Sequence, residues 1–300
     1  MRFLQWIFGR PYLLLFLTAF FWSGNSIVGR AVIHTMPPIG LAFWRWFLAF
    51  LIVLPFAVKP LIADLPVLKA HWLRVVILGL LGISTFNACL YVGLHSTQAI
   101  NSGLLQSVMP MLIIGLSAFL GERPTWHQLV GIIVALAGVL VMLFRADPAL
   151  LSAFSLNRGD IWISVGVLVY AVYSVGLRWR PKLNPLSFVA ATFAVGWISM
   201  LPLYVMETLN GDPVRLLPIN LAAIVYVAIF PSLISYLCFN RGVELLGASR
   251  AGITLYLVPL IVSLMAIVLL GEPFHLYHAI GMVLILGGVA FAESRRKDRL

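Results

Sequence analysis

Two copies of one segment lie in this chain, SGLLQSVMPMLIIGLSAFLGERPTWHQLVGIIVALAGVLVM at residues 102–142 and RAGITLYLVPLIVSLMAIVLLGEPFHLYHAIGMVLILGGVAFA at residues 250–292. The copies share a proline, a Gly-Glu pair and two glycines, found at Pro110 and Pro259, Gly121-Glu122 and Gly271-Glu272, Gly131 and Gly281, and Gly138 and Gly288. Matches continue outside the copies, 147 to 149 residues apart, at Arg30 and Arg178, Pro38 and Pro185, and Cys89 and Cys238. The chain is therefore a tandem duplication, and we predict two units, residues 1–147 and residues 148–300.

The composition excludes a water-soluble globular protein. Hydrophobic residues make up 62% of the 300 residues and charged residues 10%, whereas soluble domains average about 45–50% and about 25%. Lys and Arg (20) exceed Asp and Glu (10), but they are spread over short connections, which argues against nucleic acid as a partner. The two cysteines, Cys89 and Cys238, lie inside apolar runs and predict no disulfide framework.

Ten apolar stretches are long enough to cross a bilayer, which takes about 20 residues. They are residues 12–33, 39–58, 72–94, 99–120, 125–144, 159–178, 186–206, 219–240, 250–270 and 276–293. Five spans per repeat is an odd number, so the second repeat starts on the opposite face. We predict an all-α integral membrane protein of ten transmembrane helices in two inverted five-helix repeats, an architecture typical of transporters with a site near the bilayer midplane.

The basic residues predict the orientation. Ten spans put both termini on one side, and most of the 20 Lys and Arg residues fall in the segments on that side. Positive charge resists translocation, so we expect both termini to be cytoplasmic. The N-terminal segment lacks a small-x-small cleavage site, and we expect the first span to be retained.

The chain resembles the EamA-type ten-helix metabolite exporters of bacterial inner membranes, within the drug/metabolite transporter superfamily. The resemblance rests on Trp22-Ser23-Gly24-Asn25, on Phe43-Trp44-Arg45-Trp46 and on the duplicated proline and Gly-Glu positions. Within that family it is most similar to amino-acid exporters, including those for aromatic amino acids. The resemblance implies a small-molecule substrate, contact with membrane lipid and no cofactor, and it leaves monomer and homodimer open. Related small multidrug exporters use a glutamate in the first helix, and the absence of any acid from residues 12–33 argues against proton-coupled drug export.

Arg45 is the lone charge placed deep in a predicted span, about two turns into residues 39–58. One interpretation makes it the partner of a substrate carboxylate, because its forked donors suit that group. The other makes it a structural residue that pairs with helix-end carbonyls or packs on a tryptophan. Both interpretations stand at this stage.

Polar and aromatic residues inside the spans supply the other candidates for substrate binding, with Arg45 among them. The set is Trp22, Asn25, Arg45, Asn87, Tyr91, Asn101, Gln106, Trp162, Tyr173, Tyr236, Asn240 and Tyr256, with Ser26 and Tyr170 nearby. The pairs Asn87/Tyr91 and Tyr236/Asn240 have i,i+4 spacing, so each pair shares a helix face. The alternatives are interhelical hydrogen bonding for the amides and an interfacial belt for the aromatic residues.

The remaining features bear on mechanism. Pro110 and Pro259 are predicted mid-span kinks and candidate hinges, because proline frees a backbone carbonyl. All ten acids fall in loops or near span ends, so we expect transport without ion coupling, as in a uniporter. No nucleophile–base pair or metal-ligand cluster is visible, which argues against an enzyme and against a metal site. Export of drugs, nucleosides or sugar phosphates and a non-transporting receptor or scaffold are the alternative functions.

Overall fold

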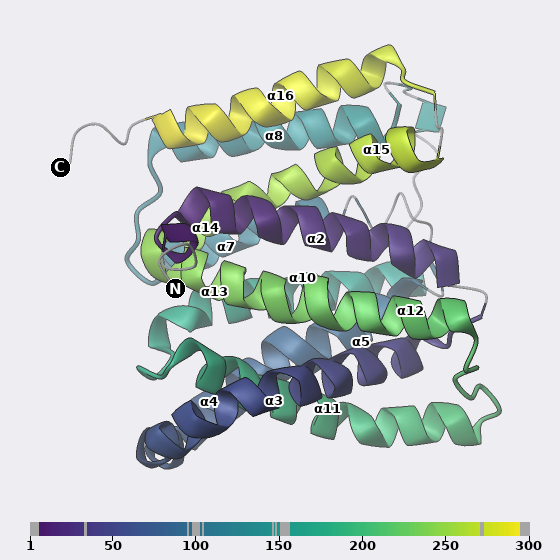
Figure 1. The fold of residues 1–300 in the computed structure, drawn as a ribbon. Coiled ribbons are helices and arrows are strands. Elements are labelled where there is room, and N and C mark those ends of the chain that lie inside the picture. The colour runs from purple at the N-terminus through teal and green to yellow at the C-terminus, as the bar shows by residue number, and fades with distance from the viewer. Residues whose placement is uncertain are drawn as a thin grey trace.

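The computed structural model describes residues 6–32, 35–94, 96–97, 103, 105–145, 147, 149–150, 157–270 and 273–294. Every regular element in these ranges is helical, and the α-helices are drawn in Figure 1. The elements are α2 (Pro11–Val32), α3 (Pro38–Ala70), α4 (Trp72–Gly79), η1 (Leu80–Thr85), α5 (Phe86–Leu94), α7 (Met109–Phe119), α8 (Trp126–Leu143), α10 (Arg158–Gly176), η2 (Leu177–Trp179), α11 (Pro185–Leu209), α12 (Pro218–Val227), η3 (Ala228–Ile234), α13 (Ser235–Leu246), α14 (Ala248–Ile253), η4 (Thr254–Tyr256), α15 (Leu257–Leu270) and α16 (Leu276–Glu293).

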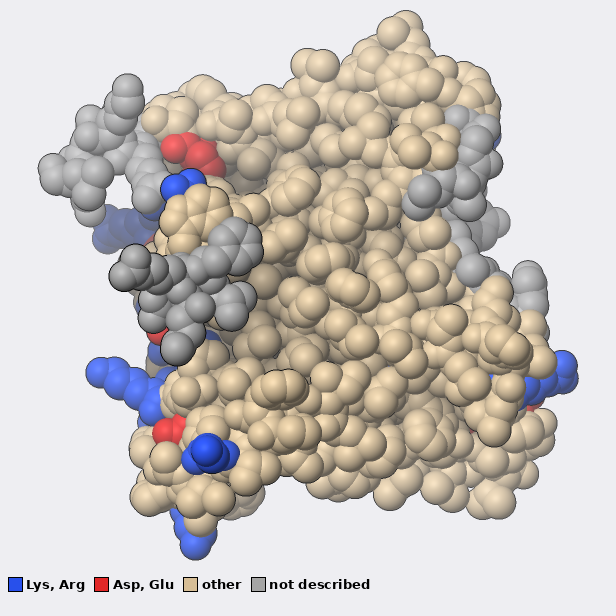
Figure 2. Space-filling model, in the orientation of Figure 1, with Lys and Arg blue, Asp and Glu red and all other residues tan. Residues whose placement is uncertain are grey.

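The helical bundle is built to span a bilayer, which confirms the predicted all-α membrane architecture. Among the described residues, nine helical spans are long and apolar enough to cross, and the fourth predicted span is represented by the shorter apolar helix Leu105–Phe119. Figure 2 shows charged side chains at the two ends of the helices and a broad uncharged band between them on the face drawn. Lipid tails can cover such a band, whereas the charged ends belong with water and headgroups.

Cap residues mark where two of the spans begin. Thr125 starts α8 by accepting a hydrogen bond from the N–H of Gln128 at 3.2 Å, while the Gln128 side chain accepts from the N–H of Thr125 at 2.9 Å. Asn157 and Asp160 make the same reciprocal pair before α10, at 3.1 and 2.7 Å. Such capping boxes satisfy N–H groups that the first helical turn leaves without partners.

The second span is longer than the sequence predicted. We expected it to end at residue 58, but α3 continues through three internal prolines, Pro55, Pro60 and Pro66, to Ala70. A proline removes one N–H and bends a helix without having to end it. At 1.5 Å per residue the 33 residues reach about 50 Å, so α3 exceeds a hydrocarbon core of about 30 Å.

The second spans of the two repeats pack antiparallel, as inverted repeats require. Near the end of α11, Glu207 accepts hydrogen bonds from the N–H groups of Ile39 and Gly40 at the start of α3, at 3.0 and 2.6 Å. Near the end of α3, Asp64 accepts from the N–H of Asn184, just before α11, at 2.8 Å. Each helix of the pair therefore supplies a carboxylate at the N-terminus of the other, where the helix dipole favours negative charge.

The fifth spans of the two repeats, α8 and α16, also pack antiparallel, along the opposite edge of the bundle from α3 and α11 (Figure 1). A Cβ added at Gly131 would lie 2.4 Å from the carbonyl oxygen of Gly288, and one added at Gly138 would lie 2.7 Å from that of Gly281. The duplicated glycines therefore let the two helices approach closely.

The mid-span prolines Pro110 and Pro259 each follow a local irregularity of their helical span. Pro110 is the second residue of α7, which follows a turn at Val108, and Pro259 is the third residue of α15, which follows the short 3₁₀ segment η4. Proline is well tolerated in the first turn, where its missing N–H would have no partner anyway. Both prolines thus lie inside apolar helical spans, Leu105–Phe119 and Ala248–Met265, each just after a local irregularity at an equivalent place, and their role as hinges stays a prediction.

Helix α2 begins and helix α16 ends on the same side of the bundle. The hydroxyl of Tyr12, at the start of α2, donates to the carboxylate of Glu293, at the end of α16. Figure 1 shows both of these helix ends at the left, and we call this side the terminus end.

Candidate functional site

Two pairs of equivalent aromatic residues meet at the centre of the bundle. Trp22 and Tyr170 are 148 residues apart and their rings lie 5.7 Å apart, while Trp46 and Phe193, 147 apart, lie 4.9 Å apart. Residues related by a two-fold axis can touch each other only at that axis. These two contacts therefore mark the pseudo-two-fold axis between the repeats, where inverted-repeat transporters bind substrate.

Arg45 lies beside this axis in a neutral polar cluster. Its side chain is only 3% exposed. Nε donates to Ser232 Oγ at 2.9 Å, and one terminal nitrogen donates to Tyr91 Oη at 3.0 Å and Asn87 Oδ1 at 3.3 Å. The guanidinium also lies 4.6 Å from the centre of the Trp46 ring. Ser232 is midway along the apolar span Pro218–Leu246, so the cluster lies deep in the bundle, away from the ends of that span.

The second half of the molecule holds a matching cluster without a charge. Tyr173 Oη donates to Asn240 Oδ1 at 2.8 Å, and both residues are buried. Asn240 occupies the repeat position of Tyr91, 149 residues earlier, and Arg45 is matched by Thr192, 147 residues later. The Thr192 hydroxyl donates to backbone carbonyls of its own helix at 2.9 and 3.1 Å. The charge is therefore carried by the first repeat.

Equivalent π-helical turns, η1 and η3, interrupt the third and eighth spans beside these clusters. The carbonyl oxygen of Gly82 in η1 accepts from Tyr236 Oη at 2.6 Å, and that of Pro231 in η3 accepts from Trp22 Nε1 at 3.0 Å. Gly82 and Pro231 stand 149 residues apart, so the same carbonyl of each repeat is used. π-Helical turns are often found at functional sites.

Sequence reasoning missed these turns, together with Ser232, whereas the packing of Arg45 on a tryptophan, observed for Trp46, was one of the two interpretations of Arg45. The available signal was weak: a glycine and a proline, Gly82 and Pro231, interrupt two otherwise apolar spans at the same repeat position. Ser232 could be found only through its contact with Arg45, which joins residues 187 positions apart.

The predicted binding residues do not all join these clusters. Arg45, Asn87, Tyr91, Tyr173, Tyr236 and Asn240 are buried together near the axis, with half-buried Trp22 against them. Asn25 and Gln106 are half-buried, Tyr256 is buried, and Asn101 lies outside the described residues. Trp162 is 50% exposed, because it shares the outward face of α10 with other apolar residues that lipid would cover. We therefore leave Trp162 out of the site.

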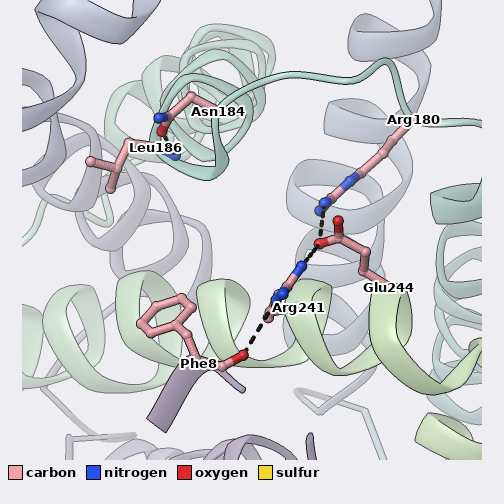
Figure 3. A network of polar contacts seen from close by, with 6 residues as sticks. All are labelled: Phe8, Arg180, Asn184, Leu186, Arg241 and Glu244. Atoms are coloured by element: carbon pink, nitrogen blue, oxygen red, sulfur yellow. Dashed lines mark hydrogen bonds and ion pairs between the residues drawn. The ribbon is translucent and has the colours of Figure 1, made fainter. Parts of the chain in front are cut away.

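Ion pairs lie on the terminus end beside Asn240 of the second cluster, and Figure 3 shows their network. Glu244 accepts from Arg180 at 2.6 Å and from Arg241 at 2.9 Å, and Arg241 Nε donates to the carbonyl of Phe8 at 3.3 Å. These residues join α13 to the segments before α11 and before α2. A cavity of about 10 Å³ lies under the ion pairs and reaches Asn240.

A larger cavity, of about 210 Å³, opens at the terminus end next to Glu122, Arg123, Ser249, Arg250 and Glu293. Glu122 is already engaged there, since it pairs with Arg178 at 3.4 Å and accepts from Ser249 at 3.2 Å. Across the described ranges, no group of three His, Cys, Asp or Glu side chains is placed to hold a metal ion.

Comparison with known proteins identifies the family. The model of the EamA-like transporter family matches twice, over residues 9–144 and 157–293. The chain is 29% identical to the uncharacterized transporter YyaM of Bacillus subtilis, over 94% of this chain and 93% of that protein. It is 25% identical to an uncharacterized transporter of Archaeoglobus fulgidus, over 96% and 98% of the two chains. A solved crystal structure shares the fold, with a TM-score of 0.78 at 21% identity over 94% of this chain and 96% of that one.

Proposed function

This chain belongs to the EamA-like transporter family, and we propose that it exports small metabolites, amino acids foremost, by alternating access through a site on the pseudo-two-fold axis. It is a multi-pass membrane transporter and not an enzyme. The observation that carries the proposal is the polar group of Arg45, Asn87, Tyr91, Tyr173 and Asn240, which is buried between two inverted repeats. Buried polar groups in a membrane are costly, and they commonly mark a substrate pathway.

The surroundings of this group suit an amino acid. Arg45 offers a cation for a carboxylate, and amide and hydroxyl groups lie within hydrogen-bonding distance of it. The ring of Trp22 lies 5.7 Å from that of Tyr170 and 6.0 Å from that of Tyr236, and this aromatic group suits an apolar or aromatic side chain.

Alternating access requires that the two ends open in turn. The ion pairs of Glu244 with Arg180 and Arg241 support a closed terminus end in this conformation. The helix breaks before Pro110 and Pro259 and the π-helical turns η1 and η3 are paired between the repeats, so they are suited to act as hinges when units 1–147 and 148–300 rock against each other.

We propose that no ion gradient drives this transport. The described acids lie near helix ends, as Asp160 does in the first turn of α10 and Glu207 near the end of α11. We place both termini in the cytoplasm of a bacterial cell, since Arg178, Arg180 and Arg241 all lie at the terminus end. Labelling of a cysteine at residue 10 by an impermeant maleimide in intact cells would overturn this orientation.

Counterflow in liposomes tests the proposed function. Vesicles that contain the purified chain and an unlabelled amino acid should accumulate the same labelled amino acid, whereas vesicles without protein should not. Accumulation should be unchanged by an imposed pH or sodium gradient. Saturable binding without any counterflow would indicate a receptor, and a steep dependence on either gradient would refute uncoupled transport.

A further inference from the structure

We infer that the site recognises a single carboxylate and does not need an ammonium group, so that small monocarboxylates as well as amino acids bind and the corresponding amines do not. This inference rests on the proposed function, because it assigns a substrate class to the same site. It follows from the balance of charges, donors and acceptors around Arg45.

Arg45 carries a charge that has no counter-ion among the residues that the structure describes. Its hydrogen-bond partners are the neutral side chains of Ser232, Asn87 and Tyr91, and its guanidinium packs on the neutral ring of Trp46. The ion pairs found in the described part of the chain all involve arginines of the terminus end. A buried cation without an anion is costly in a membrane, and a bound carboxylate would remove that cost.

Hydrogen-bond donors are in excess near the axis. Trp46 Nε1 and Tyr170 Oη are buried and have no hydrogen-bond partner. Indole can only donate. Ser232 gives its proton to the carbonyl of Val227 at 2.7 Å and is thereby left to accept from Arg45. Unpaired buried donors are uncommon in folded proteins, and a ligand rich in acceptors would satisfy them.

The acids near these clusters already bind other groups of the protein. Glu207 reaches α3 about five residues before Arg45, but it accepts from the N–H groups of Ile39 and Gly40. Glu244 lines the small cavity together with Asn240, but its carboxylate is shared by Arg180 and Arg241. Both carboxylates already bind other groups of the protein, so neither is left to pair with a substrate ammonium group in this conformation.

The matched positions of the two repeats indicate how many negative charges the substrate carries. Thr192 stands in the second repeat where Arg45 stands in the first, and its hydroxyl bonds to its own helix. A symmetric pair of arginines would suit a dicarboxylate, whereas one arginine and one threonine match one negative charge.

Three probes that share a phenethyl group test this inference on the purified full chain. Phenylalanine carries both groups, 3-phenylpropanoate only the carboxylate and phenethylamine only the ammonium group. In equilibrium binding measurements we expect 3-phenylpropanoate to bind within about ten-fold of phenylalanine and phenethylamine to bind at least about a hundred-fold more weakly. Preferential binding of phenethylamine, or no binding of either carboxylate, overturns the inference.

Variants at the matched repeat positions complete the test. Arg45→Gln should weaken binding of both carboxylates about ten- to hundred-fold, and Arg45→Lys should weaken it less, because it keeps the charge but loses the fork. Thr192→Val is the control and should bind like the wild type. Unchanged binding in Arg45→Gln overturns the inference. If Arg45→Gln does not fold, carboxylate binding by Arg45→Lys is compared with that by Thr192→Val, and equal binding by these two variants overturns the inference.

The two proposals can fail separately. Carboxylate binding that depends on Arg45, without counterflow of any amino acid, would refute export and leave this inference standing. Counterflow of amino acids, together with ligand binding that does not need a carboxylate, would support export and overturn this inference.

Discussion

Replacing Gly288 by alanine should force α16 away from α8. A Cβ at this position would lie 2.5 Å from the carbonyl oxygen of Gly131 and 2.6 Å from the backbone nitrogen of Ala135. Both atoms belong to the backbone of α8, so no side-chain rotation can relieve the overlap. The two helices would have to separate along the contact that joins the fifth spans of the two repeats.

The neighbouring glycine provides a matched control. Gly287 is on the same helix, but a Cβ there meets nothing within 4 Å. Alanine favours a helix over glycine by about 1 kcal/mol, and this gain is common to both substitutions. Overpacking typically costs about 1–3 kcal/mol. Gly288→Ala should therefore be less stable than Gly287→Ala by about 1–3 kcal/mol, which corresponds to roughly 2–10 °C in Tm for a chain of this order of size.

Thermal unfolding of the purified variants measures this difference. Cys89 and Cys238 are both buried and free, so a maleimide dye that fluoresces on reaction with thiols reports unfolding directly. Equal melting temperatures for Gly287→Ala and Gly288→Ala, or a lower value for Gly287→Ala, would refute the close packing of α8 against α16.

Two further predictions concern the site. Glu244→Gln should speed maleimide labelling of Leu237→Cys several-fold in a background without other cysteines, because it breaks the ion pairs above the small cavity that Leu237 lines. Glu244→Asp keeps the charge and should not speed labelling. Equal labelling of the Gln variant and the parent would show that the ion pairs do not close this route. Ser232→Ala should lower the unfolding free energy by about 1–3 kcal/mol, because it removes an acceptor from buried Arg45. Ser187→Ala removes a buried hydroxyl that has no partner and should lower the unfolding free energy less. Equal destabilisation of the two variants in the same dye assay would contradict this prediction.

Much of the fold could be predicted because the duplication and the bilayer each impose a simple pattern. The span expected at 125–144 is observed as Trp126–Leu143, and the one expected at 276–293 is observed there. The extension of α3 to Ala70 was missed because prolines and charges after residue 58 suggest a loop. Hydropathy marks the part of a helix that lipid covers, and it carries no information about helical turns that continue into water.

The candidate site was predicted less completely, for a physical reason. Asn87 and Tyr91 could be paired from their i,i+4 spacing, and both do contact Arg45. Ser232 became part of the cluster only through a contact between distant segments. The π-helical turns had only the weak local signal of Gly82 and Pro231, and their carbonyls find partners, Tyr236 and Trp22, in other helices.

The symmetry of the scaffold and the asymmetry of its chemistry together suggest how the repeats divide the work. Both repeats supply a π-helical carbonyl that accepts from an aromatic side chain, so the backbone geometry at the axis is shared. The charge is not shared, because Thr192 occupies in the second repeat the position that Arg45 occupies in the first. A substrate carboxylate would therefore stay with the first repeat through the cycle, while the second repeat, with Tyr170, Tyr173 and Asn240, would move past it. The energy of that motion would then depend on neutral hydrogen bonds and aromatic contacts, which can be exchanged at lower cost than a buried ion pair can be broken.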